Sequence, residues 1–504
     1  MSVELEEKAA KAGSAGQLRP EPRTEPLIFE RSGEGKVGYS LPPLDVPEGA
    51  GIPGGLVRWE IEGETEVSEV EIARHFTRLS KLNFSIDQAL YPLGSCTMKH
   101  NPRTNEEAAR LPGFAASHPF APEEVSQGTL ELAWRLERFL IELTGLSRVT
   151  LQPSAGAQGE LAGILMVRAA LAKEGNPRKI VLIPDSAHGT NPASAHFAGY
   201  KVRELKSNAR GTLDLHVLEE AMTEDVAALM LTVPNTLGIF ESQILEIARV
   251  VHARGGYLYC DGANFNSFVG MAKPGLMGID VMHMNLHKTF STPHGGGGPG
   301  SGPVAVAEKL APFLPRPTVE RRADGTYTLD YDRPESIGRL RTFLGNYGMF
   351  VRALSYISAY GNRIGEVARG AVLNANYIRA GLTGVYHLKY DAPSMHEVVF
   401  SDKKQAEHGI QAMDMAKRLM DYGFHPPTIS FPLIVHGALM IEPTETEGKP
   451  GLDAFVAAMR AIAREAQESP EVIRNAPHTT PVRRVDEVAA ARNLVLRWRP
   501  GPRT

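Results

Sequence analysis

Lys288 is the lysine whose surroundings best suit covalent chemistry. It lies in segment 285–300, which is otherwise made of apolar, small and uncharged polar residues. Burial lowers the pKa of a lysine from about 10.4, so that more of its amine is free to form a Schiff base. Glycines 295–298 would relieve crowding where a cofactor and a substrate must both fit. The alternative is a surface lysine with its amine in water, and the neighbours of Lys288 argue against it.

Asp261 directly follows the apolar run 257–260. A carboxylate at the end of a buried strand is costly to desolvate unless a cationic or proton-bearing group pairs with it. A protonated pyridine nitrogen would be such a partner. The alternatives are a helix cap or an ion pair with a structural arginine.

Two more polar segments follow apolar runs in the same way. His188, in segment 184–192, could stack on a flat heteroaromatic ring or move protons, or it could simply bond to its local backbone. Asn235, in segment 234–238, would present its amide above the sheet, although most such segments are only turns.

A candidate phosphate site opens a predicted helix after the apolar run 149–151. Its residues are Ser154, Ala155, Gly156 and Ala157. Small residues at a helix start leave backbone N–H groups and the helix dipole free to hold an anion. A tight strand-to-helix turn without a ligand is the alternative.

A phosphate cradle, a ring-stacking histidine, an acid for a ring nitrogen and a Schiff-base lysine are together the parts that pyridoxal 5'-phosphate requires. A zinc site at His283, His287 and His294 is disfavoured, because no acid lies between the first two and Lys288 would crowd a cation. A P-loop is excluded because the lysine precedes the glycines. We therefore predict no metal.

The elements that must position these residues alternate along the chain. Strands are predicted at 149–151, 180–183, 227–233, 257–260 and 281–285, and helices at 123–144, 157–171 and 244–253. This alternation predicts an α/β fold with a mostly parallel sheet covered on both faces, whose ligands bind at the carboxyl ends of the strands. Further along the chain we predict a hairpin or loop at 321–326, a long helix at 343–382 and a buried strand at 431–441.

The predicted organisation has four parts. They are an N-terminal arm with a helical and loop segment (1–120), a large cofactor-binding α/β domain (121–310), a connecting insert with a long helix (311–386) and a smaller α+β domain (387–504).

The composition narrows the class of protein. The 504 residues carry a formal charge of −4, which gives no electrostatic footprint for nucleic acid or for a membrane surface. No apolar run reaches the roughly 18 residues of a membrane span. The acidic start fits neither a signal peptide nor a transit peptide, and two cysteines are too few for a disulfide framework, so we expect a cytoplasmic protein.

Across nearly its whole length the chain resembles the P-proteins of the glycine cleavage system, the glycine dehydrogenase (decarboxylating) family, in the form of their subunit 2. The matching segments are 91–99, 118–120, 151–160, 185–194, 234–241, 261–264, 285–300, 431–435 and 442–447. The run 286–300 is the most specific of them. Two departures are His100, where the family has tyrosine, and His436-Gly437, where it has Pro-Glu; neither touches the cofactor residues.

The resemblance implies a fold-type I pyridoxal phosphate enzyme with a seven-stranded sheet. Lys288 would carry the cofactor, Asp261 would keep its ring nitrogen protonated, and His188 would stack on the ring. Glycine would bind as an external aldimine and lose carbon dioxide, and its aminomethyl group would pass to the lipoyl arm of H-protein. The implied cofactor-binding residues are Ser154, Ala155, Gly156, Ala157, His188, Thr190, Asn235, Asp261, Ala263, His287, Lys288 and Thr289.

The resemblance also implies partners. The family occurs as one chain of about double this length or as two subunits, of which only one bears the lysine, so we expect a subunit 1 and an assembly with two of each. The loop with Tyr91, Ser95, Cys96, Thr97 and Lys99 is a candidate for closing over the substrate or the lipoyl arm, or a purely structural turn. Cys96 could be redox-sensitive or an inert buried thiol.

Another fold-type I enzyme, an aminotransferase or an amino-acid decarboxylase, is the alternative function. Such an enzyme would usually show a dedicated arginine for the substrate carboxylate. The sequence does not single one out.

Overall fold

A computed structural model describes residues 24–47, 49, 51–59, 61, 63–294 and 300–497. The acidic start of the chain and glycines 295–298 lie outside the described residues. The chain divides into two compact units, one formed by Met1–Gln88 with Asn475–Thr504 and one by Ala89–Arg474. None of the helices in the described residues is long and apolar enough to cross a membrane.

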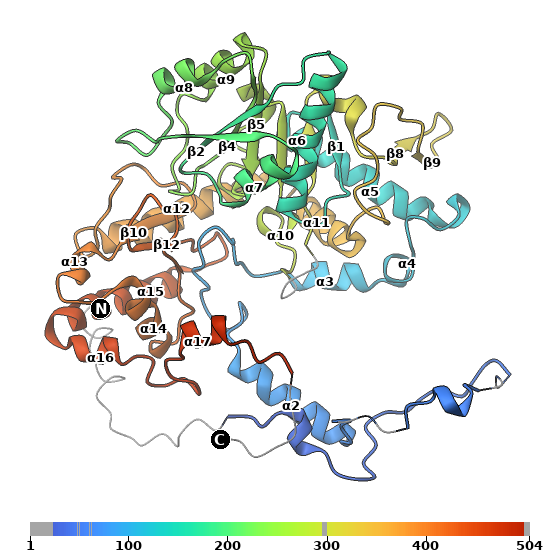
Figure 1. Cartoon of the computed structure of the whole chain (residues 1–504), viewed down its shortest axis with the longest axis vertical. Coiled ribbons are helices and arrows are strands. Elements are labelled where there is room, and N and C mark those ends of the chain that lie inside the picture. The colour runs from blue at the N-terminus through green and yellow to red at the C-terminus, as the bar shows by residue number, and fades with distance from the viewer. Residues whose placement is uncertain are drawn as a thin grey trace. The chain divides into compact units, whose positions relative to one another are not determined.

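A seven-stranded sheet organises the larger unit, in the order β1-β7-β6-β5-β4-β2-β3. Figure 1 labels β1, β2, β4 and β5 of this sheet. β7 runs antiparallel to both of its neighbours, and the other pairs are parallel. This confirms the predicted mostly parallel sheet. The strands are β1 (Arg148–Thr150), β2 (Ile180–Pro184), β3 (Lys201–Leu205), β4 (Val226–Thr232), β5 (Tyr257–Gly262), β6 (Val281–Met284) and β7 (Val304–Val306).

Alternate residues of each strand feed two hydrophobic cores, one on each face of the sheet. In β5, Leu258 and Cys260 belong to one core, and Tyr257 and Tyr259 belong to the other. The first core includes residues of α5, α8, α9 and α11, and the second includes α6 and α7. The helices are α5 (Glu123–Thr144), α6 (Gly156–Lys173), α7 (Thr190–Phe197), α8 (Leu215–Ala221), α9 (Ile244–Ala253), α10 (Leu286–Thr289) and α11 (Tyr347–Tyr360).

Two strands were missed by the sequence prediction. β3 is an edge strand, and its Lys201, Arg203 and Glu204 hide the strand pattern. β7 is only three residues long and follows a glycine-rich segment.

Two longer predictions were wrong in their extent. The predicted helix 343–382 is α11 followed by η6 (Gly361–Arg363) and α12 (Gly365–Leu382), because Gly361 adopts φ 53° and ends the first helix. In the predicted strand 431–441, only β12 (Ala438–Ile441) is extended in a sheet; Gly437, at φ 61°, precedes it. The hairpin around 321–326 is confirmed by β8 (Thr318–Arg321) and β9 (Tyr327–Asp330).

A second, three-stranded antiparallel sheet lies in the C-terminal part of the larger unit, in the order β10-β12-β11. Helices α12, α14 and α15 contribute to its core. Its elements are β10 (Val398–Ser401), α13 (Lys403–Ala406), α14 (Ala412–Asp421), β11 (Thr428–Ile429), α15 (Lys449–Glu468) and α16 (Pro470–Arg474). The larger unit also contains α3 (Arg103–Arg110), α4 (Pro112–Ala115), η3 (Phe265–Ser267), η4 (Pro274–Met277) and η5 (Glu308–Phe313).

The smaller unit contains η1 (Ile28–Arg31), η2 (Gly54–Leu56), α2 (Glu69–Leu82) and α17 (Glu487–Arg492). Ser68 and Glu71 form a capping box that starts α2. Glu25 accepts hydrogen bonds from Arg78 on that helix, at 2.7 and 3.0 Å, and thereby ties the preceding chain to α2.

Candidate active site

The predicted polar segments lie at the carboxyl ends of the parallel strands. β1 leads into the start of α6, β2 into the segment with His188, and β6 into α10 with Lys288, and Asp261 is the second-last residue of β5. Because β5 and β6 are neighbours in the sheet, Asp261 and Lys288 lie at the ends of adjacent strands. This edge of the sheet is where ligands bind in open α/β folds.

Asp261 is almost completely buried, with 1% of its surface exposed, and both of its carboxylate oxygens are hydrogen-bonded. Oδ1 accepts from the N–H of Ala263 at 3.0 Å and from Nε2 of His283 at 3.1 Å, and Oδ2 accepts from Nδ2 of Asn191 at 3.0 Å. Burial alone would raise the pKa of Asp261, but the positive charge and hydrogen bond of His283 hold the pKa well below its ordinary value. The site therefore contains a buried negative charge.

His283 was missed as a partner of Asp261, because the sequence suggested it only as one residue of a disfavoured zinc site. Its Nδ1 lies 3.0 Å from the hydroxyl of Tyr259. Burial opposes protonation of His283, yet the carboxylate of Asp261 outweighs this and raises the pKa of His283. The His283 imidazolium thus compensates the charge of Asp261.

A hydrogen-bond chain joins His188 to Asp261. His188 Nδ1 lies 2.8 Å from Oγ1 of Thr190, which donates to Glu160 at 2.7 Å. The other oxygen of Glu160 accepts from Asn191, whose side chain also donates to Asp261. Burial lowers the pKa of His188, and the charge of Lys288 lowers it further against the opposing charge of Asp261. The neutral imidazole is therefore favoured.

Glu160 was also missed, although it lies in the predicted helix-start segment. Ligand atoms of Glu160, Asp261 and His283 lie within 4.8 Å of one another and could in principle hold a metal. The hydrogen bonds just described, together with that from Ser194 to Glu160 at 3.2 Å, already satisfy these groups. The cluster is therefore explained as a buried polar network.

Lys288 lies on the single turn of α10 and is buried, with 9% of its surface exposed. Its Nζ donates a hydrogen bond of 2.6 Å to the carbonyl oxygen of Ser95. Its charge also lowers the pKa of His396, which burial lowers to about 3. The amine thus faces the 91–99 loop and the C-terminal sheet as well as His188.

Of the residues predicted to hold a phosphate, Gly156 and Ala157 present groups that fit that role. The first turn of α6 leaves the N–H groups of Gly156 and Ala157 without acceptors inside the helix. A side chain at Gly156 would lie 2.8 Å from Oδ1 of Asn285, so this oxygen lies beside the helix start. Oδ1 of Asn285 and Oγ1 of Thr289 are buried and have no hydrogen-bond partner among the described residues. The free N–H groups at this helix start suit an anion. The unpaired hydroxyl of Thr289 can donate to an added ligand, whereas Oδ1 of Asn285 is an acceptor and cannot pair with a phosphate oxygen.

Other predicted cofactor residues use their polar groups locally. Asn235 donates to the carbonyl of Gly211 at 2.7 Å, and its Oδ1 accepts from two N–H groups of its own turn. His287 accepts from the N–H of Ser301 at 3.3 Å, and burial lowers the pKa of His287 to about 3. Ser154 donates to the side chain of Gln158. Their roles toward a cofactor stay predictions.

The 91–99 loop lies against the C-terminal sheet. Tyr91 stacks on His425, with ring centroids 3.9 Å apart. The N–H of Ser95 donates to Glu397 at 2.9 Å, and that of Thr97 donates to Glu442 at 3.0 Å. These carboxyl partners are more than 300 residues away in sequence, and no local signal pointed to them.

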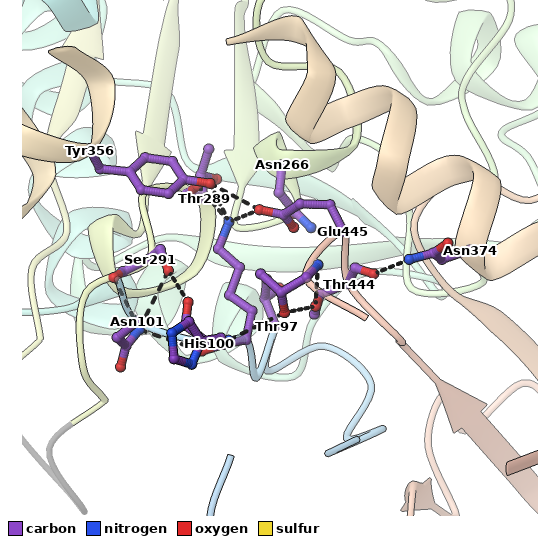
Figure 2. A network of polar contacts seen from close by, with 12 residues as sticks. Thr97, His100, Asn101, Asn266, Thr289, Ser291, Tyr356, Asn374, Thr444 and Glu445 are labelled. Carbon is purple, nitrogen blue, oxygen red and sulfur yellow. Dashed lines mark hydrogen bonds and ion pairs between the residues drawn. The ribbon is translucent and has the colours of Figure 1, made fainter. Parts of the chain in front are cut away.

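Lys99 ends this loop in a second buried network. Its Nζ donates to Oε1 of Glu445 at 2.6 Å, to the carbonyl of Thr289 at 2.9 Å and to the hydroxyl of Tyr356 at 3.3 Å. Figure 2 labels Tyr356, Thr289 and Glu445, the three residues that accept these hydrogen bonds. Because Thr289 follows Lys288 directly, Lys99 fixes the backbone of the turn that carries Lys288.

The order of the large sheet, its single antiparallel strand, and the buried lysine and carboxylate that follow β6 and β5 define the fold-type I class of pyridoxal phosphate enzymes. Solved structures agree with this fold. A crystal structure of glycine decarboxylase (P-protein) of the glycine cleavage system, in inhibitor-bound form, matches with a TM-score of 0.66 and 21% identity, over 92% of this chain and 98% of that chain. An aspartate aminotransferase from Thermus thermophilus matches with a TM-score of 0.56 and 14% identity, over 75% and 99% of the two chains.

Sequence comparisons identify the family. The family model for the glycine cleavage system P-protein matches residues 48–326, and that for the C-terminal domain of glycine dehydrogenase matches residues 367–480. A probable glycine dehydrogenase (decarboxylating) subunit 2 from Caldanaerobacter subterraneus subsp. tengcongensis is 54% identical over 94% of this chain and 98% of its own. One from Bacillus licheniformis is also 54% identical, with the same coverage. The chain belongs to the glycine cleavage system P-protein family.

Proposed function

We propose that this chain is the catalytic subunit of a glycine cleavage P-protein. It binds glycine, releases carbon dioxide and passes the aminomethyl group to the lipoyl arm of H-protein. The observation that carries the proposal is the buried Lys288, one strand away from the buried carboxylate of Asp261. Relatives named as subunit 2 of glycine dehydrogenase (decarboxylating), matched over 98% of their length, support the choice of substrate.

Each residue has a role that its surroundings support. Lys288 would provide the amine that binds pyridoxal phosphate, and the start of α6 with Thr289 would hold the phosphate. Asp261, kept ionised by His283, would favour a protonated ring nitrogen, and His188 would contact the ring. The bound cofactor supplies an electron sink for the charge left on glycine when carbon dioxide departs.

The partners follow from the same relationship. A lysine-less subunit 1, two copies of each subunit, and lipoylated H-protein complete the proposed enzyme, which works in the cytoplasm. Two free cysteines, Cys96 and Cys260, are compatible with a reducing compartment.

Absorbance spectroscopy with pyridoxal phosphate tests the covalent assignment. The wild-type chain should develop the visible band of a cofactor aldehyde joined to a lysine amine. Lys288→Ala should lack this band, and Lys206→Ala, at an exposed lysine, should keep it. An unchanged band in Lys288→Ala would remove the assignment.

Exchange of carbon between glycine and bicarbonate tests the reaction. We expect exchange when the chain, subunit 1 and H-protein are combined, and none when Lys288→Ala replaces the chain. Full exchange by the chain alone would contradict the proposed two-subunit enzyme.

A further inference from the structure

Two buried carboxyl groups face each other in the C-terminal sheet. Glu397 precedes β10 and Glu442 follows β12, and the register of these antiparallel strands pairs Val398 with Ile441. The next pair of positions is therefore Glu397 opposite Glu442, and both side chains are completely buried. Like charges directly opposite each other destabilise a sheet, so the sheet alone does not account for this pair.

Both carboxyl groups hold the turn at Ser95 and Thr97. Glu397 accepts from the N–H of Ser95 at 2.9 Å. Glu442 accepts from the N–H of Thr97 at 3.0 Å and from its hydroxyl at 2.6 Å. Ser95 and Thr97 adopt φ 61° and 48°, a left-handed conformation that costs a serine, and a β-branched threonine even more, free energy. The turn thus depends on contacts from outside itself.

Ser95 links Glu397 to the reactive lysine. Its N–H is bound to Glu397, and its carbonyl oxygen accepts the 2.6 Å hydrogen bond from Nζ of Lys288. Two backbone groups of one residue therefore join the C-terminal sheet to the amine. The loop has further anchors, because the carbonyl of Pro92 accepts from the N–H of Glu442 and that of Gly94 accepts from the hydroxyl of Thr428.

The charge state of the pair follows from its surroundings. Burial raises the pKa of Glu397 well above its ordinary value, and the charge of Glu442 adds to this. Burial also raises the pKa of Glu442, against the hydrogen bonds of Thr97 and the charge of Lys288. The other titratable groups around the pair are Cys96 and His396. Carboxyl oxygens of the two residues lie within 4.8 Å of each other in a site that is closed to water. Ionising both groups there is unfavourable, so the pair retains one proton.

The proton belongs on Glu397. Its Oε1 has no hydrogen-bond partner among the described residues and lies 3.6 Å from Nε2 of His396. Glu442, by contrast, also accepts from Nδ2 of Asn266 at 3.2 Å, so both of its oxygens have donors, as a carboxylate requires.

We propose that Glu397 and Glu442 are positioning residues for Lys288, which hold the turn at Ser95 and Thr97 so that the Ser95 carbonyl orients the amine, with Glu397 acting as a neutral acid. This deepens the proposed function and rests on it where it concerns the reaction of Lys288 with an aldehyde. A divalent metal on His396, Glu397 and Glu442, whose ligand atoms lie within 4.8 Å of one another, is the competing account.

Amide hydrogen exchange of the full-length chain tests the turn without any cofactor. In Glu397→Ala, exchange of residues 95–97 should accelerate about tenfold or more, because a buried hydrogen bond to the backbone is lost. Glu397→Gln keeps a neutral acceptor and should stay within about threefold of wild type. Thr97→Val preserves side-chain volume and removes only the hydrogen bond from the hydroxyl to Glu442. It should therefore increase the rate of amide exchange at residues 95–97 by an intermediate amount, and it keeps the test available if Glu397→Ala folds poorly.

Glu241→Gln is the matched control. Glu241 is also buried and accepts from a backbone N–H, that of Leu213, at 3.1 Å. Exchange at residues 95–97 should be unchanged in this variant. Exchange in Glu397→Ala equal to that in wild type would overturn the proposal.

The rate at which pyridoxal phosphate forms its visible band tests the effect on Lys288. Glu397→Ala should form the band about tenfold more slowly, and Glu397→Gln and Glu241→Gln should match wild type. Equal impairment of Glu397→Gln and Glu397→Ala, or one equivalent of divalent metal in the purified chain, would overturn the neutral-acid assignment. Failure of the wild type to form any band would refute the proposed function. Amide hydrogen exchange at residues 95–97 would still decide the positioning role of Glu397 and Glu442.

Discussion

Asp261 and His283 illustrate how a buried charge is maintained inside an apolar sheet. A lone carboxylate in this position would take up a proton, because desolvation disfavours its charged form. His283 supplies a compensating charge at 3.1 Å, and Asn191 supplies a hydrogen bond at 3.0 Å. Asp261 can therefore present a permanent negative charge to a ring nitrogen.

The Asp261–His283 pair should make stability depend on pH. The pKa of Asp261 is lowered in the folded chain, so Asp261 contributes to folding stability above about pH 4. The pKa of His283 is raised, so its contribution to stability is complete below about pH 6.5 and is lost as the pH rises through the raised value. His283→Gln should therefore lower the thermal midpoint more at pH 6 than at pH 9. Equal losses at the two pH values, measured by scanning fluorimetry, would contradict the ion pair.

Glu241 is a buried acid without a counter-charge, so its pKa should shift in the opposite direction to that of Asp261. Burial raises the pKa of Glu241 to about 7, against the hydrogen bond from Leu213. Its folded-state proton is retained while the unfolded chain has already lost it, so stability is lost as the pH rises from about 4.5 to 7. Glu241→Gln cannot ionise and should gain about 2 kcal/mol on the wild type between pH 5 and pH 8. Parallel midpoint curves for the two proteins would argue against a buried acid.

The sequence located the residues that follow strands and missed the residues that support them. Asp261 was visible because it directly follows an apolar run, and His188 and Lys288 were visible because each lies in a polar segment that begins after one. Glu397 was not visible, because its meaning depends on Ser95, which lies 302 positions earlier. Residue type and spacing can predict candidate residues within one segment of the chain. Hydrogen bonds between segments that are distant in sequence can be identified only once the fold is known.

The helices and strands that were predicted correctly are those whose ends or apolar patterns are marked in the local sequence. α5 (Glu123–Thr144) has the predicted bounds, because acidic residues occupy its first turn and Gly145, at φ 67°, ends it. β3 had no such signal, because charged residues on an exposed edge interrupt its apolar pattern. β7 is a short apolar run of three residues that follows a glycine-rich segment, and its surroundings gave no strand signal. The break at Gly361 depends on a backbone angle that periodicity does not report.

The packing of the 91–99 loop on β12 can be tested at Gly94. A side chain there would lie 2.7 Å from the carbonyl oxygen of Met440 and would contact its side chain, so the loop must shift. Gly94→Ala should destabilise the chain by about 1–3 kcal/mol in chemical denaturation and slow formation of the cofactor band. Gly113→Ala, in α4 with no atom within 4 Å of the added carbon, should remain within about 0.5 kcal/mol of wild type. Similar stabilities of the two variants would contradict the described packing.

At the scale of the whole molecule, the candidate site draws on three distant parts of the chain. The large sheet contributes Lys288 and Asp261, the 91–99 loop contributes the Ser95 carbonyl, and the C-terminal sheet contributes Glu397 and Glu442. These contacts all lie within the compact unit Ala89–Arg474. The site can therefore form only when this unit folds as a whole.

The smaller unit carries large apolar side chains that lie in water, among them Tyr39, Leu41, Leu56 and Trp59. Such a concentration of exposed apolar surface is typical of interfaces, and the proposed subunit 1 is the partner that we expect to cover it. Trp59, with 79% of its surface exposed, is a natural reporter. Binding of subunit 1 should shift its emission to shorter wavelength and reduce its quenching by iodide, because water leaves the indole ring.

Trp59→Phe provides the control for this experiment, because its remaining fluorescence should change little when subunit 1 is added. The chain also contains Trp498, so both samples carry Trp498→Phe. The remaining background then comes from Trp134, which belongs to the larger unit and packs partly buried against the core of the sheet. Size-exclusion chromatography must show that the complex has formed in both samples. A complex of wild-type chain and subunit 1 that leaves Trp59 emission and quenching unchanged would place the interface elsewhere on the molecule.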